Sequence, residues 1–245
     1  VVISSRKADV CEEVAAAIRK SGGDASVVAC NIGRKGDVEG LIKGALAKYG
    51  RLDHLVCNAA VNPYFGPLSG ISDDAFDKIM DSNIKSNLWL ANTAAPHIAA
   101  QGGGSITIVS SIGGLRGSTQ LGAYGISKAA DFGLGRALAA ELGPKNIRVN
   151  CIAPGLVRTP MVDPVFQQVA DRRGISLDEA YAVCGAHLPS GRMGLPEDFG
   201  GPAAFLASDD ARWVTGAVLN VDGGTTVLNP GMMGVMAQLH GGAEA

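Results

Sequence analysis

The sequence predicts an α/β fold: a Rossmann-like doubly wound parallel sheet with helices on both faces, in a single domain. Short apolar runs alternate along the chain with helical segments of about 10–20 residues, the order found in parallel α/β proteins. The runs are continuously apolar, as in strands that are buried on both faces. The 245 residues fit one such domain, and neither a repeat nor a linker divides them. We expect the domain to span 1–228 and a Gly- and Met-rich tail to span 229–245.

The N-terminal part of the chain contains the first predicted strands and two helices. The glycines of Ser21–Asp24 end the first helix, and Gly50 ends the second. The elements expected here are a strand at 1–5, a helix at 8–20, a strand at 25–30, a helix at 37–49 and a strand at 52–57.

The rest of the chain is dominated by two long helices. The first is expected at 72–100, with Pro96 as the candidate position for a bend. The second runs from Tyr124 to about Leu142. Its spacing predicts an inward stripe of Ile126, Ala130, Leu134 and Leu138. The other elements expected are strands at 105–110, 147–153 and 217–221, a helix at 196–207, and a polar insertion with short helices at about 160–190.

The composition limits the kind of protein this can be. Hydrophobic residues make up 47% of the chain and the mean hydropathy is +0.18, which is enough for a buried core. The net charge of −2 argues against nucleic acid as a partner. No apolar run approaches the roughly 18 residues of a membrane span, so we expect none. The histidines lack ligand spacing and the five cysteines are scattered, which predicts no metal site and a reducing, cytoplasmic setting.

Polar and small residues follow five of the predicted strands, at their carboxyl ends. A single such end is explained by the turn that follows it. Five in succession define one edge of a parallel sheet, where the ligands of doubly wound folds bind, and they favour one extended ligand across it. These ends are Ser5-Arg6, Asn31-Ile32, Asn58-Ala59-Ala60, Ser110-Ser111 and Pro154-Gly155.

Tyr124 and Lys128 are four residues apart on a predicted helix, so their side chains fall on the same face. A nearby ammonium favours the phenolate and lowers the pKa of a tyrosine. Such a tyrosine suits proton transfer to or from a carbonyl or alcohol oxygen, which Ser111 at a strand end could hold against the phenol. A surface pair without a chemical role is the alternative, because Tyr-x-x-x-Lys also arises by chance.

Further motifs place this pair in a wider pattern. Asn58-Ala59-Ala60 follows a strand, Asn83 lies in a predicted helix, and Pro154-Gly155 and Val221–Gly224 follow later strands. With Ser111 and Tyr124-Gly-Ile-Ser-Lys128 at matching separations, the chain resembles the short-chain dehydrogenase/reductase family from Val1 to about Thr226. Ser4–Lys7 and 58–66 are similar to the NADP-dependent retinol dehydrogenase/carbonyl reductase branch of that family.

The resemblance implies a mechanism. Tyr124 would be the acid in carbonyl reduction and the base in alcohol oxidation, and Ser111 would orient the substrate oxygen. Lys128 would lower the pKa of Tyr124 and bind the nicotinamide ribose. Asn83 would bind a water that links Lys128 to solvent.

The resemblance also implies a nicotinamide cofactor. NADP(H) is expected over NAD(H), because Ser5, Arg6 and Lys7 stand where NAD-preferring members carry an acidic residue. Solvated charges at a helix start are the alternative reading of Arg6 and Lys7. Asn31-Ile32 would lie beside the adenine, and Tyr124 and Lys128 would also contact the cofactor. The other expected cofactor contacts are Asn58, Ala59 and Ala60 at the ribose, and Pro154, Gly155, Val157 and Thr159 at the nicotinamide.

One part of the family pattern is missing from this sequence. The first strand and its Thr-Gly-x-x-x-Gly-x-Gly phosphate loop have no counterpart, so a gap is expected between the strands at 1–5 and 52–57. The expected reaction is reduction of a small lipophilic ketone or aldehyde, or its reverse, and Val162 and Phe166 could contact the substrate or form lid core. Reduction of a 3-oxoacyl thioester and a non-catalytic subunit are the alternatives. The resemblance further implies a homotetramer or homodimer through the helices at 72–100 and 122–142.

Overall fold

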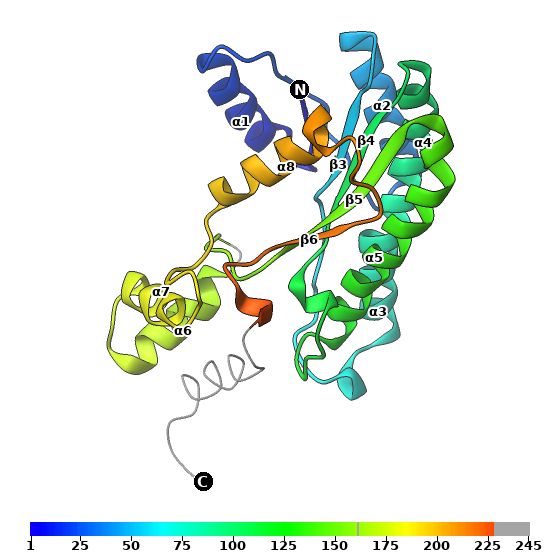
Figure 1. Ribbon diagram of the computed structural model, residues 1–245. Coiled ribbons are helices and arrows are strands. Elements are labelled where there is room, and N and C mark those ends of the chain that lie inside the picture. Colours follow the sequence, from blue (N-terminus) through cyan, green and yellow to red (C-terminus); the bar gives the residue numbers. More distant parts are fainter. Residues whose placement is uncertain (161, 228–245) are drawn as a thin grey trace.

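The computed structural model, which describes residues 1–160 and 162–227, confirms the predicted α/β fold (Figure 1). All paired strands are parallel. A two-stranded sheet joins β1 (Val2–Ile3) to β2 (Ser26–Val27), and a four-stranded sheet has the order β3-β4-β5-β6. The strands of this larger sheet are β3 (His54–Cys57), β4 (Gly104–Val109), β5 (Ile147–Pro154) and β6 (Val218–Val221).

The two sheets are not joined by hydrogen bonds, which confirms the gap expected between the first and third predicted strands. Among the strands of the described residues, β1 pairs only with β2, and β3 pairs only with β4. Val56 of β3 is consequently 51% exposed, although its neighbours on β4 are buried. Helix α1 (Ala8–Lys20) packs against β1 and β2.

Helices cover both faces of the larger sheet. Helices α4 (Ser86–Ala100) and α5 (Gly122–Leu142) lie on one face with α2 (Lys35–Tyr49) packed on α4, and α8 (Gly200–Ala207) lies on the other (Figure 1). β4 and β5 are almost entirely buried, as continuously apolar strands predict. The core they form with the helices has fully buried members in Ile98, Ile106, Ile108, Ile147 and Val149.

The helical region predicted at 72–100 is interrupted. Ser72 caps α3 (Asp73–Met80) by accepting a hydrogen bond from the amide of Ala75. A π-helical turn at Asp81–Lys85 then separates α3 from α4, and Pro96 lies inside α4. Such turns concentrate at functional sites.

The inward stripe predicted for α5 is confirmed only in its second half, where Leu138 is buried in the core and Leu134 packs against it. Ile126 is 43% exposed, whereas the polar side chains of Ser127, Lys128 and Asp131 are buried. The first turns of α5 bury these polar residues because they find partners inside the protein, so burial there does not follow the apolar pattern alone.

The polar insertion forms a helical pair with a small core of its own. Helices α6 (Asp163–Arg173) and α7 (Leu177–Ala186) pack together, and the rings of Phe166 and Tyr181 stack at 4.2 Å. Ser176 and Glu179 form a capping box at the start of α7. Phe166 and Val162 therefore belong to the core of this pair, one of the two roles considered for them.

No helix within 1–160 and 162–227 is long and apolar enough to cross a membrane. The predicted tail at 229–245 lies outside the described residues.

Candidate active site

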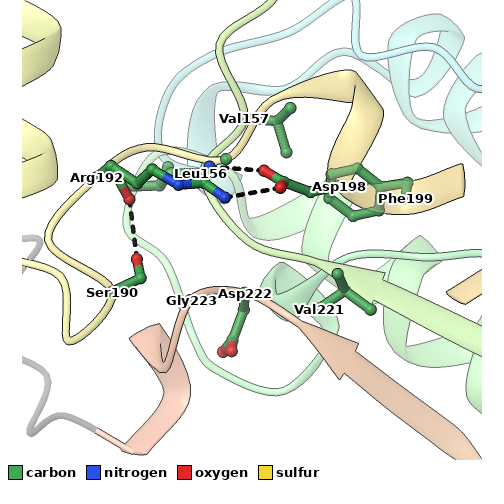
Figure 2. A pocket seen from close by; sticks show the side chains of 10 residues that line it. Leu156, Val157, Ser190, Arg192, Asp198, Phe199, Val221, Asp222 and Gly223 are labelled. Carbon is green, nitrogen blue, oxygen red and sulfur yellow. Dashed lines mark hydrogen bonds and ion pairs between the residues drawn. The ribbon is translucent and has the colours of Figure 1, made fainter. Parts of the chain in front are cut away.

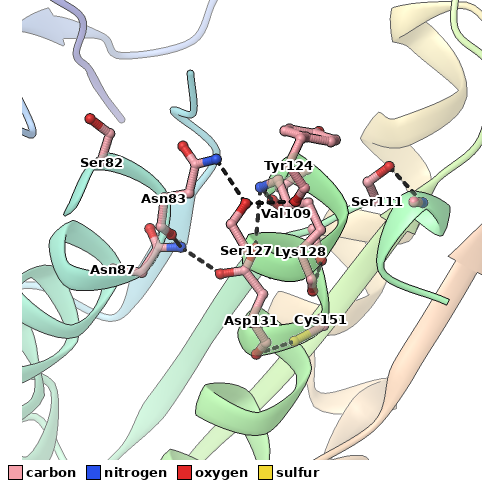
Figure 3. Close-up of polar contacts among 12 residues, drawn as sticks. Ser82, Asn83, Asn87, Val109, Ser111, Tyr124, Ser127, Lys128, Asp131 and Cys151 are labelled. Carbon is pink, nitrogen blue, oxygen red and sulfur yellow. Dashed lines mark hydrogen bonds and ion pairs between the residues drawn. The ribbon is translucent and has the colours of Figure 1, made fainter. Parts of the chain in front are cut away.

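Three elements bring the predicted catalytic residues together (Figure 3). Ser111 follows β4, and Tyr124 and Lys128 occupy the first two turns of α5. Asn83 comes from the π-helical turn before α4. The short 3₁₀ turn Ile112–Gly114, which Ser111 caps, packs against α5. The parallel topology thus places these side chains at the carboxyl-terminal edge of the sheet, as predicted.

Lys128 is almost completely buried, with 2% of its side chain exposed. Its Nζ donates to the carbonyl of Val109 at 3.0 Å and to Oδ2 of Asp131 at 3.2 Å. The ammonium also lies 5.7 Å from the centre of the Tyr124 ring. Lys128 therefore lies near Tyr124 as predicted, but its ammonium is also paired with the carboxylate of Asp131.

The pKa of Tyr124 is raised from its ordinary value, not lowered as predicted. Burial is the main cause, because it penalises the phenolate, and the negative charge of Asp131 acts in the same direction. A side-chain hydrogen bond with Ser111 opposes them. A Cβ placed on Gly113 would lie 3.3 Å from Oγ of Ser111 and 3.8 Å from the Tyr124 ring, so both side chains border Gly113. The Ser111 hydroxyl accepts from the amide of Gly113 at 3.0 Å.

Asn83 is fully buried, and its side chain is fixed at both ends. Its Oδ1 accepts from the amide of Val61 at 2.8 Å, and its Nδ2 donates to the Val61 carbonyl and to Oγ of Ser127, each at 3.0 Å. Asn83 therefore ties the loop after β3 to helix α5.

Sequence reasoning missed Asn87 and Asp131 beside Lys128, and it named Ser110 only as part of a strand end. Ser110 donates to the carbonyl of Lys128 at 2.7 Å, and Asn87 donates to Oδ1 of Asp131 at 3.0 Å. The position of Asp131 offered a signal, because it lies three residues after Lys128 and so falls on the same helix face.

The residues predicted beside the adenine and the 2′-phosphate gather at the end of the small sheet. Arg6 follows β1, Asn31 follows β2, and both line a pocket of about 270 Å³ with Arg34, which the sequence reasoning missed. The backbone amide of Cys30 donates to the carbonyl of Ser5 at 3.0 Å, which fixes the two strand ends side by side. Ile32 packs against the main core.

The residues predicted at the cofactor ribose follow β3. Asn58 and Ala59 are exposed and Ala60 is half-buried, so this loop borders open space beside Asn83.

The residues predicted at the nicotinamide follow β5. Pro154 pairs with Val221, and the amide of Gly155 donates to the Val221 carbonyl at 3.0 Å. A Cβ at Gly155 would lie 2.6 Å from the Cα of Asp222, so only glycine fits there. Val157 bridges to Gly194, and the carbonyl of Thr159 accepts from the first amides of the α6 region.

Figure 2 shows a pocket of about 280 Å³ beside this segment. Val157, Asp222 and Gly223 line it, and Arg192 crosses it to form a bidentate ion pair with Asp198, each N–O distance being 2.7 Å. Tyr124 does not line this pocket, so the structure does not bring Val157 and Tyr124 into one enclosed cavity.

The arrangement can hold an extended anionic ligand and move a proton. Arg6 and Arg34 provide positive charge at one end, and the pocket lined by Val157 and Gly223 provides space at the other. The phenol of Tyr124 with the hydroxyl of Ser111 provides a proton donor and a hydrogen-bond partner for an oxygen. Among the described residues, no cluster of three or more His, Cys, Asp or Glu has the geometry of a metal site.

A parallel α/β sheet with serine, tyrosine and lysine at its carboxyl-terminal edge defines a Rossmann-type oxidoreductase. A family model described as enoyl-(acyl carrier protein) reductase matches residues 1–226. The chain belongs to the short-chain dehydrogenase/reductase family.

Individual relatives agree with this assignment. Mouse dehydrogenase/reductase SDR family member 4 is 38% identical over 92% of this chain and 77% of its own length, which confirms the predicted branch. A crystal structure of levodione reductase has a TM-score of 0.85 and 26% identity, over 93% of this chain and 88% of that one. A 7α-hydroxysteroid dehydrogenase in complex with NADH and 7-oxo glycochenodeoxycholic acid has a TM-score of 0.77 and 32% identity, over 91% and 83% of the two chains.

Proposed function

We propose that the protein is an NADP(H)-dependent oxidoreductase that reduces a ketone or aldehyde to an alcohol, or catalyses the reverse reaction, with Tyr124 as the general acid or base. The observation that carries the proposal is the position of Tyr124, which borders Gly113 together with Ser111 and has the buried ammonium of Lys128 5.7 Å from its ring centre. A phenol and a second hydroxyl that meet at one point suit a carbonyl oxygen, which gains a proton as it is reduced.

Each residue of the site has a role in this reaction. Ser111 orients the substrate oxygen and stabilises the charge that develops on it. Tyr124 donates its phenolic proton to that oxygen in reduction and accepts it in oxidation. Lys128 supplies positive charge beside the phenol and binds the cofactor ribose. Asn83 holds the loop after β3 in place and belongs to the path by which Lys128 exchanges protons with solvent.

The cofactor residues follow the same edge of the sheet. When bound, the nicotinamide supplies the hydride donor or acceptor. Arg6 and Arg34 would bind a 2′-phosphate, which favours NADP(H) over NAD(H), and Ser5 adds a hydroxyl at the strand end. The remaining residues proposed to line the cofactor are Asn31, Ile32, Asn58, Ala59, Ala60, Pro154, Gly155, Val157 and Thr159.

A small lipophilic carbonyl compound or alcohol is the proposed substrate. Phe65 and Leu115 are exposed apolar side chains in loops that follow β3 and β4, and they support a lipophilic substrate. A 3-oxoacyl thioester is the second candidate, and the description of the matching family model supports an acyl-carrier-protein substrate, although it names an enoyl group. A non-catalytic subunit is the third, which the intact Ser111, Tyr124 and Lys128 disfavour.

The proposed setting is a cytoplasmic homotetramer or homodimer built from residues 1–228 as one domain. Exposed Leu88 on α4 and Ile126 on α5 support an interface through these long helices. Cys11, Cys30, Cys57 and Cys151 are buried free thiols, which is consistent with a reducing compartment.

Oxidation of NADPH by an aromatic ketone, retinal and an acetoacetyl thioester tests the proposal. We expect turnover of at least one carbonyl substrate, and a loss of about 10²-fold or more in kcat for Tyr124→Phe with cofactor binding retained. Turnover of the thioester alone would favour the second candidate. Absence of both turnover and cofactor binding would favour the non-catalytic subunit.

A further inference from the structure

The ion pair between Lys128 and Asp131 differs from the other ion pairs described within 1–160 and 162–227. Its side chains are 2% and 0% exposed, whereas in the other pairs both partners are at least 31% exposed. A buried carboxylate is costly to desolvate, and such a pair is often no more stable than apolar residues of the same size. Stability alone therefore does not account for Asp131.

The carboxylate of Asp131 is held from two helices. Its Oδ2 accepts from Nζ of Lys128 on α5 at 3.2 Å, and its Oδ1 accepts from Nδ2 of Asn87 on α4 at 3.0 Å. The same Asn87 amide donates to the carbonyl of Asn83 at 2.7 Å. A continuous row of hydrogen bonds thus runs from the π-helical turn through Asn87 and Asp131 to the ammonium of Lys128 (Figure 3).

We propose that Asp131 is a positioning residue for proton transfer: its carboxylate fixes Nζ of Lys128 and balances the ammonium charge, so that Tyr124 remains a protonated phenol. This inference rests on the proposed function of the same site. A tyrosine that keeps its proton is ready to act as an acid, so Asp131 favours carbonyl reduction over alcohol oxidation near neutral pH.

The charge environment of the pair supports this role. The pKa of Tyr124 is raised by burial and by the charge of Asp131. Burial also raises the pKa of Asp131, while the Lys128 ammonium and the Asn87 amide stabilise its charged form. Removal of the Asp131 charge should therefore lower the pKa of Tyr124, because the phenolate forms more easily when no negative charge lies near it.

Few other charges face these groups. The thiols of Cys57 on β3 and Cys151 on β5 have pKa values raised to about 12 by burial, so they stay neutral, and Arg136 of α5 acts on Cys151. Arg148 of β5 is half-buried and donates to the carbonyls of Leu206 and Ser208. The other charged residues of the elements packed on α5 are exposed and screened by water. They are Asp73, Asp74, Asp77 and Lys78 of α3, Asp81 and Lys85 of the π-helical turn, and Lys145 after α5.

The test compares tyrosinate absorbance of the wild type and of Asp131→Asn, each against its own Tyr124→Phe derivative, at about pH 10. The difference isolates the ionisation of Tyr124 and needs neither substrate nor cofactor. We expect the Tyr124 tyrosinate fraction to rise about twofold or more in Asp131→Asn. In turnover assays, the alkaline fall of the reduction rate should begin at lower pH in this variant. Asp131→Glu should restore both wild-type properties, and Asp53→Asn, in the exposed pair with Arg51, should change neither.

Failure of the role proposed for Asp131 can be told apart from failure of the proposed oxidoreductase activity. An unchanged Tyr124 titration in folded Asp131→Asn would overturn the role of Asp131, even if the protein is an active reductase. An inactive protein with the expected titration would reject the proposed reaction and leave the charge effect of Asp131 intact. If Asp131→Asn does not fold, the titration of Tyr124 in the wild type still tests the proposal. A Tyr124 that ionises more readily than an ordinary tyrosine would contradict it.

Discussion

Gly155, just after β5, lies so close to Asp222, just after β6, that its position has no room for a side chain. A Cβ there would lie 2.6 Å from Cα and 2.8 Å from Cβ of Asp222, and backbone atoms cannot move aside as a flexible side chain can. We expect Gly155→Ala to lower the free energy of unfolding by about 1–3 kcal/mol and to weaken NADPH binding, measured by thermal melting and fluorescence titration.

Gly133 in α5 provides the matched control for this change. A Cβ at Gly133 would have no neighbour within 4 Å, and alanine is the better helix former. Gly133→Ala should therefore raise stability by about 0.5–1 kcal/mol. Equal destabilisation by both changes would show that the approach to Asp222 is not the cause.

Arg6 and Arg34 provide a second prediction about single residues. Both line the pocket at the end of β1 and β2, and an arginine pairs strongly with a phosphate. We expect Arg6→Ala and Arg34→Ala each to weaken NADPH binding about tenfold, while NADH binding changes little, as measured by the dissociation constant of each cofactor. Lys20→Ala, an exposed cation outside that pocket, is the control. Equal losses for the two cofactors would argue against recognition of the 2′-phosphate.

The π-helical turn before α4 is the element that connects the loop after β3 to α5. Asn83 satisfies both backbone groups of Val61, which would lose these partners in Asn83→Ala. We expect this change to cost about 1–3 kcal/mol of stability and to weaken cofactor binding through the loosened 58–61 loop. Calorimetry and a cofactor titration measure the two effects. Asn220→Ala, at an exposed position on β6, should change neither quantity appreciably.

The sequence predicted which segments form strands and helices better than it predicted which of their residues are buried. β4 and β5 were found because their apolar runs are buried on both faces, and helices α1 and α2 because glycines mark their ends. The helix predicted at 196–207 is α-helical only from Gly200, because Pro196–Phe199 form a 3₁₀ turn. The buried face was misplaced only in the first turns of α5, because Ser127 and Asp131 are polar and apolar periodicity alone places polar residues at the surface. Their burial depends on Asn83, Asn87 and Lys128, which come together only in the folded chain.

The candidate site shows the same limit. The local spacing of Tyr124 and Lys128 and the strand-end position of Ser111 predicted which side chains would meet. The direction of the Tyr124 pKa was not predictable, because it depends on burial and on Asp131, and neither is a property of the four-residue spacing. The π-helical turn was also not predictable, since no residue type in Asp81–Lys85 is specific to such a turn.

At the scale of the whole molecule, the separation of the two sheets predicts uneven stability. β4 is paired on both sides, whereas β1 and β2 form a two-stranded sheet of two residues per strand. Isolated two-stranded sheets are marginally stable. We expect amides of β1 and β2 to exchange with solvent deuterium at least about tenfold faster than those of β4 and β5. Uniform exchange by hydrogen–deuterium mass spectrometry would contradict this, and NADPH should slow exchange at β1 and β2 preferentially.

The row formed by Cys57, Ile108 and Cys151 crosses three neighbouring strands in register. Both thiols are buried and have pKa values raised to about 12, so maleimides and similar reagents meet neither an accessible sulfur nor a thiolate. Alkylation at these two positions then has to wait until β3 and β5 separate from the helices that cover them. The rate at which Cys57 and Cys151 are alkylated therefore reports how often the central sheet opens. Mass spectrometry can measure this rate without an engineered probe.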